Sequence, residues 1–188
     1  MESFIRDAVL EHMKRHGLLS PKQFGFIAGR STVTQLLIYL DRCAEMMANG
    51  KVVDSIYLDF QKAFDTVPHR RLIKKLEAYG INGPVLEWIR EYLRGRSQVV
   101  VVNGEKSDEA PVISGIPQGT VLGPLLFVVY INDPLDILSS NELLYADDTK
   151  IFCQISSRYD AEALQSDIKK LKEWTEKWLP YGPLFRRS

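Results

Sequence analysis

The chain has 188 residues, of which 45% are apolar. This length and composition are enough to bury a hydrophobic core, so an intrinsically disordered protein is excluded. Lys and Arg together number 24, as do Asp and Glu, and this neutrality argues against a protein that binds nucleic acid over its whole surface, although local basic patches remain open. Cys43 and Cys153 lie far apart and the three histidines do not group as metal ligands, so neither a disulfide framework nor a zinc site is expected.

The first quarter of the chain predicts two helices joined by an irregular segment over residues 18–30. Residues 4–16 have helical spacing and end at Gly17, a residue that commonly follows a helix. Ser31 or Thr32 can cap the second helix, which ends at Asn49-Gly50. Its apolar residues form one stripe at helical spacing, made of Val33, Leu36, Leu37, Leu40, Ala44 and Met47.

A nearly all-apolar run over residues 52–60 predicts a buried strand with Asp59 near its end. Two short helices are expected over residues 69–79 and 84–94, because each is followed by a glycine. Asn103-Gly104 is a strong turn signal, and it predicts a β-hairpin formed by residues 98–102 and 110–113.

The last third of the chain begins with a loop rich in Gly and Pro over residues 115–123. It leads into an apolar helix over about 121–131, a hairpin over 143–155 and a final amphipathic helix over 160–178. Residues 180–188 have no periodicity. Strands and helices alternate without a strict βαβ rhythm, so we expect an α+β fold whose mostly antiparallel sheet has helices packed on one face.

The tip of the last hairpin reads Tyr145-Ala146-Asp147-Asp148 and lies between apolar runs. Adjacent carboxylates disfavour each other's ionisation unless a cation lies between them. Carboxylate oxygens are the ligands that a hard cation such as Mg²⁺ takes. The alternative is an ordinary exposed turn, since Asp favours turns through its own side-chain hydrogen bonds.

Asp59 is a candidate third carboxylate. A charge at the end of an apolar strand is unfavourable unless it has a partner. If this strand lies beside the hairpin, Asp59 comes level with Asp147 and Asp148, and three such groups suit a pair of Mg²⁺ ions that assist phosphoryl transfer. The alternative is that Asp59 pairs with a nearby basic residue.

Four segments resemble the reverse transcriptases of non-LTR retrotransposons, in the order and at the spacing of that family. Leu58-Asp59-Phe60-Gln61-Lys62-Ala63-Phe64-Asp65-Thr66-Val67-Pro68-His69 is similar to motif A, Ser114 to Phe127 (SGIPQGTVLGPLLF) to motif B, and Tyr145 to Asp148 to motif C. Residues 23–32 (QFGFIAGRST) resemble the segment of the fingers that precedes them. The resemblance covers roughly residues 1–178.

The resemblance implies RNA-templated DNA synthesis with two Mg²⁺ ions, for which Mn²⁺ is a substitute. It implies these roles: Asp59, Asp147 and Asp148 as catalytic metal ligands with the Phe60 carbonyl as a further ligand, Phe64 as the steric gate against a 2′-OH, Gln118 and Gly119 as nucleotide contacts, Arg30 and Lys62 as triphosphate contacts, and Tyr145 as a primer contact. The physical properties agree, because glycines at 115 and 119 allow close backbone approach and a guanidinium suits phosphate.

The same resemblance implies a right-hand polymerase with fingers over residues 1–50, a palm over 51–178 with fingers elements inserted at about 80–112, and a divergent tail over 179–188. The expected partners are an RNA template, a DNA primer and a dNTP, without a membrane. The family's motif D lysine, later palm strands and thumb are not found in the sequence, nor is an endonuclease domain. The alternative function is therefore an inactive relic or a co-opted module that binds nucleic acid or protein.

No signal peptide or membrane span is apparent in the sequence. We therefore expect an intracellular protein, in the nucleus and/or the cytoplasm.

Overall fold

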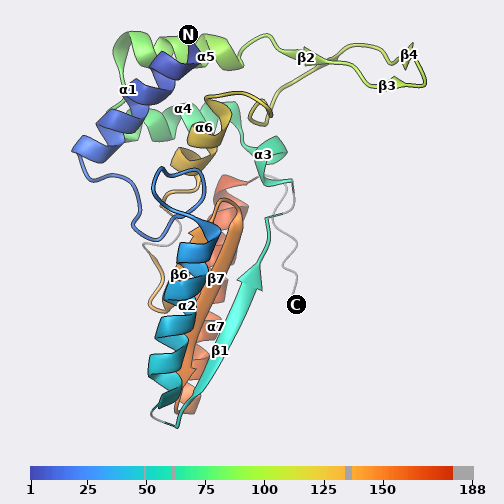
Figure 1. The fold of residues 1–188 in the computed structure, drawn as a ribbon. Coiled ribbons are helices and arrows are strands. Elements are labelled where there is room, and N and C mark those ends of the chain that lie inside the picture. The colour runs from blue at the N-terminus through green and yellow to red at the C-terminus, as the bar shows by residue number, and fades with distance from the viewer. Residues whose placement is uncertain (49, 61, 134–136, 180–188) are drawn as a thin grey trace.

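A computed structural model describes residues 1–48, 50–60, 62–133 and 137–179 (Figure 1). The α+β fold class with antiparallel strands is confirmed. The helices are α1 (Glu2–Arg15), α2 (Thr32–Ala48), α3 (Ala63–Thr66), α4 (His69–Ala78), α5 (Gly83–Leu93), α6 (Gly123–Tyr130) and α7 (Arg158–Trp178). The strands are β1 (Val52–Leu58), β2 (Ser97–Gln98), β3 (Val101–Val102), β4 (Glu105–Lys106), β5 (Ala110–Pro111), β6 (Asn141–Tyr145) and β7 (Asp148–Ile155).

The main sheet has the order β1-β7-β6 and both of its strand pairs are antiparallel. β6 and β7 form the predicted hairpin, in which Tyr145 pairs with Asp148. β1 runs along the other side of β7, with Val52 opposite Ile155 and Leu58 opposite Thr149. The chain therefore leaves β1 at the same end of the sheet at which the hairpin turns.

Helices cover both faces of this sheet, so the expectation of helices on one face is wrong in that detail (Figure 1). Side chains alternate between the faces of a strand. On β7, Ile151 belongs to the cluster that contains Leu164 and Leu171 of α7, whereas the neighbouring Phe152 packs with Cys43 of α2. Each face of β7 is therefore covered by a helix, which explains why the consecutive residues Ile151, Phe152 and Cys153 are all apolar.

α2 contacts the sheet through a face different from its predicted apolar stripe. Ile38, Tyr39, Cys43 and Met46 lie against the sheet. The stripe faces outward instead, with these exposed residues: Val33, Leu36, Leu37, Leu40 and Met47. α2 thus has two apolar faces. Only the face with Tyr39 and Cys43 packs against the sheet.

A second layer of helices lies at the end of the sheet where the hairpin turns, as Figure 1 shows. α6 is apolar on all sides and buried, as expected for a helix surrounded by protein. α4 contacts both α5 and α6, and α1 contacts α5. The cluster of buried residues that includes Phe127 and Tyr130 of α6 also includes Ile151 of β7, so the helical layer and the sheet share one core.

The predicted hairpin around Asn103-Gly104 forms a ribbon of two short ladders, β2 with β5 and β3 with β4. Asn103 and Gly104 both have positive φ, 51° and 85°, as a two-residue hairpin turn requires. The ribbon projects from the helical layer in Figure 1, and the side chains of its four consecutive valines, Val99 to Val102, are exposed.

Helix ends follow local sequence signals. The Thr34 amide donates to Ser31 Oγ at 3.1 Å, so Ser31 caps α2. Ser157 and Asp160 form a capping box at the start of α7. Among the described residues, no helix is both long and apolar enough to span a membrane. Of the predicted tail over 179–188, residues 180–188 lie outside the described part of the chain.

Candidate active site

Three aspartates meet where β1 ends and the β6–β7 hairpin turns. Leu58 pairs with Thr149, so the next residue, Asp59, lies beside Asp148. Asp147 occupies the two-residue turn between Tyr145 and Asp148. Asp147 is half-buried, whereas Asp59 and Asp148 are exposed. The strand pairing therefore produces the convergence that the sequence predicts.

The electrostatics of Asp147 show that these carboxylates interact. Burial raises the pKa of Asp147, and the negative charges of Asp148 and Asp59 raise it further. As they stand, the side chains of the described residues form no cluster of three or more His, Cys, Asp or Glu that could hold a metal ion. Asp59 and Asp148 are exposed, however, and exposed side chains can change rotamer.

The turn that carries Asp147 has an unusual backbone. Ala146 has φ 55°, in the left-handed region that side chains other than glycine rarely adopt. A two-residue hairpin turn demands positive φ, and natural sequences usually meet this demand with Gly or Asn. The Ala146 side chain is nevertheless buried, so the turn is held by its surroundings.

Phe64, the predicted steric gate, lies on α3 directly after the carboxylate strand. Its ring stacks on Phe127 of α6 with centroids 4.1 Å apart and planes 18° from parallel. Phe26 meets the same ring edge-on at 6.0 Å. The ring is therefore fixed from two sides, by a buried helix and by the segment that precedes α2.

The motif B segment is joined to the end of motif A by several hydrogen bonds. The Ile116 amide donates to the Phe64 carbonyl at 2.8 Å, and the Gly115 amide donates to the Val67 carbonyl at 2.8 Å. Gly115 has φ 93°, and a Cβ on it would lie 2.9 Å from the Asp65 carbonyl oxygen. The absence of a side chain at Gly115 thus allows the motif B backbone to lie directly against the backbone of Asp65.

Gln118 also contacts motif A, because its Nε2 donates to Asp65 Oδ1 at 3.2 Å. Asp65, Gln118 and the base of the ribbon, from Arg96 to Gln98, line one open groove of about 630 Å³. Gly119 follows with φ 72°, and no heavy atom of the described residues, its chain neighbours aside, lies within 4 Å of the position that a Cβ would take. A separate groove of about 380 Å³ lies between β1 and α7, lined by residues such as Ile56 and Ile168 and by none of the three aspartates.

The remaining predicted residues have varied surroundings. Arg30 Nη1 donates to the carbonyls of Ser20 and Pro21 at 3.1 Å each, and to that of Gln23. The Phe60 carbonyl accepts from the Ala63 amide at 3.1 Å. Two further residues have these positions: Lys62 is exposed with φ 52° at the start of α3, and Tyr145 is half-buried at the end of β6.

Two residues of the site were missed by sequence reasoning as individual residues. Asp65 belongs to the motif A segment, where the resemblance implies no role for it, and it accepts a hydrogen bond from Gln118. Gln23 belongs to the fingers-like segment, and its side chain is hydrogen-bonded to Ala146. Because Gln23 and Ala146 are 123 residues apart, no local pattern links them. The sequence offers one signal for Gln23: it is a polar amide next to the mostly apolar residues 24–28, where a buried amide needs a hydrogen-bond partner.

Comparison with known proteins gives a consistent picture. A family model for reverse transcriptase (RNA-dependent DNA polymerase) matches residues 4–179. The chain is 31% identical over 183 residues to a probable RNA-directed DNA polymerase from transposon X-element of Drosophila melanogaster, covering 94% of this chain and 20% of the relative. It is 34% identical over 166 residues to the RNA-directed DNA polymerase from mobile element jockey of the same organism, covering 83% of this chain and 18% of the relative.

The fold is similar to a solved structure of apo telomerase from Candida tropicalis truncated from the C-terminal domain. The TM-score is 0.65 at 12% identity, and the match covers 93% of this chain and 38% of that one. The chain thus spans about a fifth of the length of the curated relatives above and under half of the structural one.

Proposed function

The chain belongs to the reverse transcriptase (RNA-dependent DNA polymerase) family, and we propose that it carries the nucleotidyl-transfer centre of a longer RNA-templated DNA polymerase. The resemblance to reverse transcriptases of non-LTR retrotransposons is confirmed by the transposon polymerases to which it is similar. The observation that carries the proposal is the convergence of Asp59 with Asp147 and Asp148 at one end of the sheet.

The residues at this end fit divalent cations. The pKa of Asp147 is raised by burial and by two like charges, and a bound cation would remove the second cause. Asp59, Asp147 and Asp148 would hold two Mg²⁺ ions, or Mn²⁺ in their place, with the Phe60 carbonyl as a further ligand. Bound there, two such ions would stabilise the attacking and leaving oxygens of phosphoryl transfer.

The nucleotide would lie between the aspartates and the groove beside Gln118. We assign to Phe64 the exclusion of a 2′-OH, because the contacts of its ring with Phe127 and Phe26 prevent it from moving aside. Gln118 and Gly119 would contact the nucleotide from the motif B loop. Their position is fixed by Asp65 and by the backbone bonds between the two motifs.

The other contacts are assigned in the same proposal. Arg30 Nη1 is engaged with backbone carbonyls, and a guanidinium has five N–H donors, so its remaining nitrogens are assigned to the triphosphate together with Lys62. Tyr145 would contact the primer end. In the reaction, the primer 3′-OH attacks the α-phosphate of the dNTP, which releases pyrophosphate.

The partners in this proposal are an RNA template, a DNA primer and a dNTP, and its place is inside the cell, in the nucleus and/or the cytoplasm. Residues 1–50 would form part of the fingers and residues 51–178 the palm, with fingers elements inserted at about 80–112. The projecting ribbon, β2 to β5, falls within that insertion. The part of the relatives outside the matched fifth would supply further contacts to the duplex.

Primer extension tests the proposal. The chain is incubated with an RNA template, a DNA primer, dNTPs and Mg²⁺, and the expected result is primer elongation that is lost in the Asp147→Ala/Asp148→Ala variant. A product no greater than that of the double variant would refute activity of this chain. Nothing found in the described residues or in the comparisons favours the alternative of an inactive relic or co-opted module.

A further inference from the structure

Gln23 is a buried side chain whose amide lies against the turn that carries Asp147. Only 2% of its surface is exposed. Its Oε1 accepts from the Ala146 amide at 2.9 Å, and its Nε2 donates to the Ala146 carbonyl at 3.3 Å. One side chain thereby satisfies both backbone polar groups of the residue with positive φ. A buried amide with this arrangement fixes a backbone conformation, because leaving those groups unpaired is unfavourable.

The same Oε1 also accepts from the Gly25 amide at 2.7 Å, so Gln23 joins its own segment to the turn. Gly25 lies against Ala146 so closely that a Cβ on it would overlap the Ala146 amide nitrogen and lie 2.9 Å from its Cα. No side chain larger than hydrogen fits there without displacing the turn. The segment that contains Gln23 and the turn therefore pack backbone against backbone.

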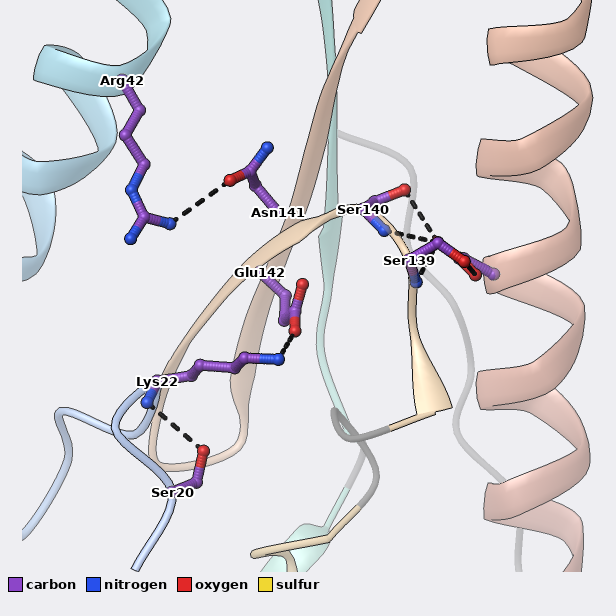
Figure 2. Close-up of polar contacts among 8 residues, drawn as sticks. Ser20, Lys22, Arg42, Ser139, Ser140, Asn141 and Glu142 are labelled. Atoms are coloured by element: carbon purple, nitrogen blue, oxygen red, sulfur yellow. Dashed lines mark hydrogen bonds and ion pairs between the residues drawn. The ribbon is translucent and has the colours of Figure 1, made fainter.

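Backbone hydrogen bonds hold the two segments in register. Gln23 forms a parallel bridge with Leu144 of β6. The Phe24 amide donates to the Leu144 carbonyl at 2.8 Å, and the Leu144 amide donates to the Lys22 carbonyl at 2.9 Å. Figure 2 shows a further link, in which the Lys22 side chain reaches Glu142 of β6 as an ion pair. These contacts extend the sheet edge by a short segment that ends at the turn.

Arg30 fixes the segment from its other side. Its Nη1 donates to the carbonyls of Ser20, Pro21 and Gln23, and its guanidinium lies 5.5 Å from the centroid of the Phe24 ring. One cation thus gathers three carbonyls of the loop immediately before Gly25. The position of Gln23 is determined by this loop as well as by the sheet.

We propose that Gln23 is a positioning residue for the Asp147–Asp148 turn, holding Ala146 at positive φ so that both carboxylates are presented for cation binding. The inference rests on the proposed function, because it concerns the same carboxylates. It goes beyond that function by assigning a role to a residue that touches neither nucleotide nor metal. Loss of the amide would leave Asp147 and Asp148 in the chain but allow their turn to relax.

Hydrogen exchange of the metal-free chain, followed by NMR, tests the positioning directly. In Gln23→Met, which keeps an unbranched side chain of similar size, the Ala146 and Gly25 amides should lose about tenfold or more of their protection. The Phe24 and Leu144 amides, which bond to backbone carbonyls, should keep theirs. Unchanged exchange at Ala146 and Gly25 overturns the proposal. Loss of protection along the whole chain also overturns it, because Gln23 would then be a general core residue.

Titration with Mn²⁺, followed by the electron paramagnetic resonance signal of the free ion, tests the consequence. We expect the Kd for Mn²⁺ to rise about 10–100-fold in Gln23→Met, the range found when groups that orient metal ligands are removed. Asp167→Asn is the matched control, since Asp167 of α7 is buried and accepts hydrogen bonds from the amides of Ser139 and Ser140, which precede β6 and lie at the other end of that strand from the turn. Its affinity should equal that of the unmodified chain.

A second variant pair reaches the same turn without changing Gln23. Gly25→Ala should weaken Mn²⁺ binding because its methyl group displaces Ala146. Gly104→Ala, in the turn of the projecting ribbon, should not, because its positive φ of 85° confines the strain of the substitution to the ribbon. Equal Mn²⁺ affinity in Gln23→Met and the unmodified chain overturns the positioning role. If the unmodified chain shows no Mn²⁺ binding that Asp147→Ala/Asp148→Ala removes, the proposed function fails, while the exchange measurement still decides whether Gln23 holds the turn.

Discussion

The ring of Phe64 stacks on that of Phe127 with centroids 4.1 Å apart. This contact joins α3, which follows the carboxylate strand, to α6, which is buried on all sides. Phe127 is fully buried and cannot retreat, so any ligand that presses on the free side of Phe64 meets a rigid surface. The stacking therefore supports the proposal that Phe64 excludes a 2′-OH at the sugar of a nucleotide.

Replacement of Phe64 by Val should remove this discrimination. We expect Phe64→Val to raise ribonucleotide use relative to deoxynucleotide use by about a hundredfold, since differences in pocket contacts of this kind contribute about 1–3 kcal/mol. The measurement is the ratio of kcat/KM for the two nucleotides in primer extension. Phe4→Val is the control, because Phe4 is an exposed phenylalanine of α1 that takes no part in the stacking of Phe64. An unchanged ratio in Phe64→Val would exclude the gate.

The stability of the chain should increase when Asp147 is neutralised. Burial and two like charges raise the pKa of this carboxyl in the folded state. The folded chain therefore binds more protons than the unfolded chain between the two pKa values, and stability falls as pH rises through that range. Asp147→Asn removes the penalty, so its Tm at neutral pH should exceed that of the unmodified chain.

This difference in Tm should shrink as pH falls below the ordinary pKa of Asp, because the Asp147 carboxyl is then protonated and neutral in both the folded and the unfolded chain. It should also shrink when Mg²⁺ or Mn²⁺ is added to the unmodified chain, because a bound cation stabilises the folded state. Thermal unfolding over a pH series, with and without the cation, measures both effects. A lower Tm for Asp147→Asn at neutral pH would contradict the argument.

Gly115 should tolerate alanine much less well than Gly119, although both have positive φ. At Gly119 the methyl group meets open space, so only the backbone conformation is unfavourable, by about 1–2 kcal/mol. At Gly115 the methyl group also presses on the Asp65 backbone, which adds about 1–3 kcal/mol. Urea unfolding of the two variants measures the difference. Equal decreases in the free energy of unfolding for the two variants would contradict this prediction, because they would mean that motif B can move away from the Asp65 backbone of motif A without loss of stability.

The sequence predicts best those elements whose signals are local. α1, α7 and the β6–β7 hairpin lie close to their predicted ranges, because periodicity, capping residues and a following glycine are each read within a few residues. The convergence of Asp59 with the hairpin was predictable for a related reason. Two apolar strands ending in carboxylates bury their apolar residues best side by side, and antiparallel pairing then sets Asp59 level with Asp148.

Contacts between distant segments could not be predicted in the same way. α2 has two apolar faces, and nothing in its spacing decides that Tyr39 and Cys43 pack on the sheet while Leu37 and Leu40 stay exposed. The bonds of Gln23 join a side chain to backbone groups 123 residues away, and such bonds leave no periodic signal. Tertiary packing, which depends on shape, decided both cases.

Lys75 supplies a prediction that lies away from the carboxylates. Its ammonium is buried, donates to the Tyr130 carbonyl at 2.6 Å and pairs with Asp133. It also lies 4.7 Å and 4.4 Å from the ring centroids of Trp174 and Trp178 of α7. Burial lowers the pKa of Lys75 to about 8, although the charge of Asp133 opposes the change. This amine thus links α4, α6 and α7 at a point where its charge is only partly compensated.

The lowered pKa fixes the sign of a pH effect on stability. Between pH 8 and the ordinary value of 10.5, the folded chain binds fewer protons at this site than the unfolded chain, so Lys75 makes stability rise with pH across that window. The rise amounts to at most about 3 kcal/mol. It should be absent from Lys75→Met, so the difference between the two chains in free energy of unfolding, measured with urea from pH 7 to 11, isolates it from other titrating groups. A difference that stays constant with pH would show that Lys75 keeps its ordinary pKa, and that the aromatic rings of α7 stabilise the ammonium enough to offset its burial.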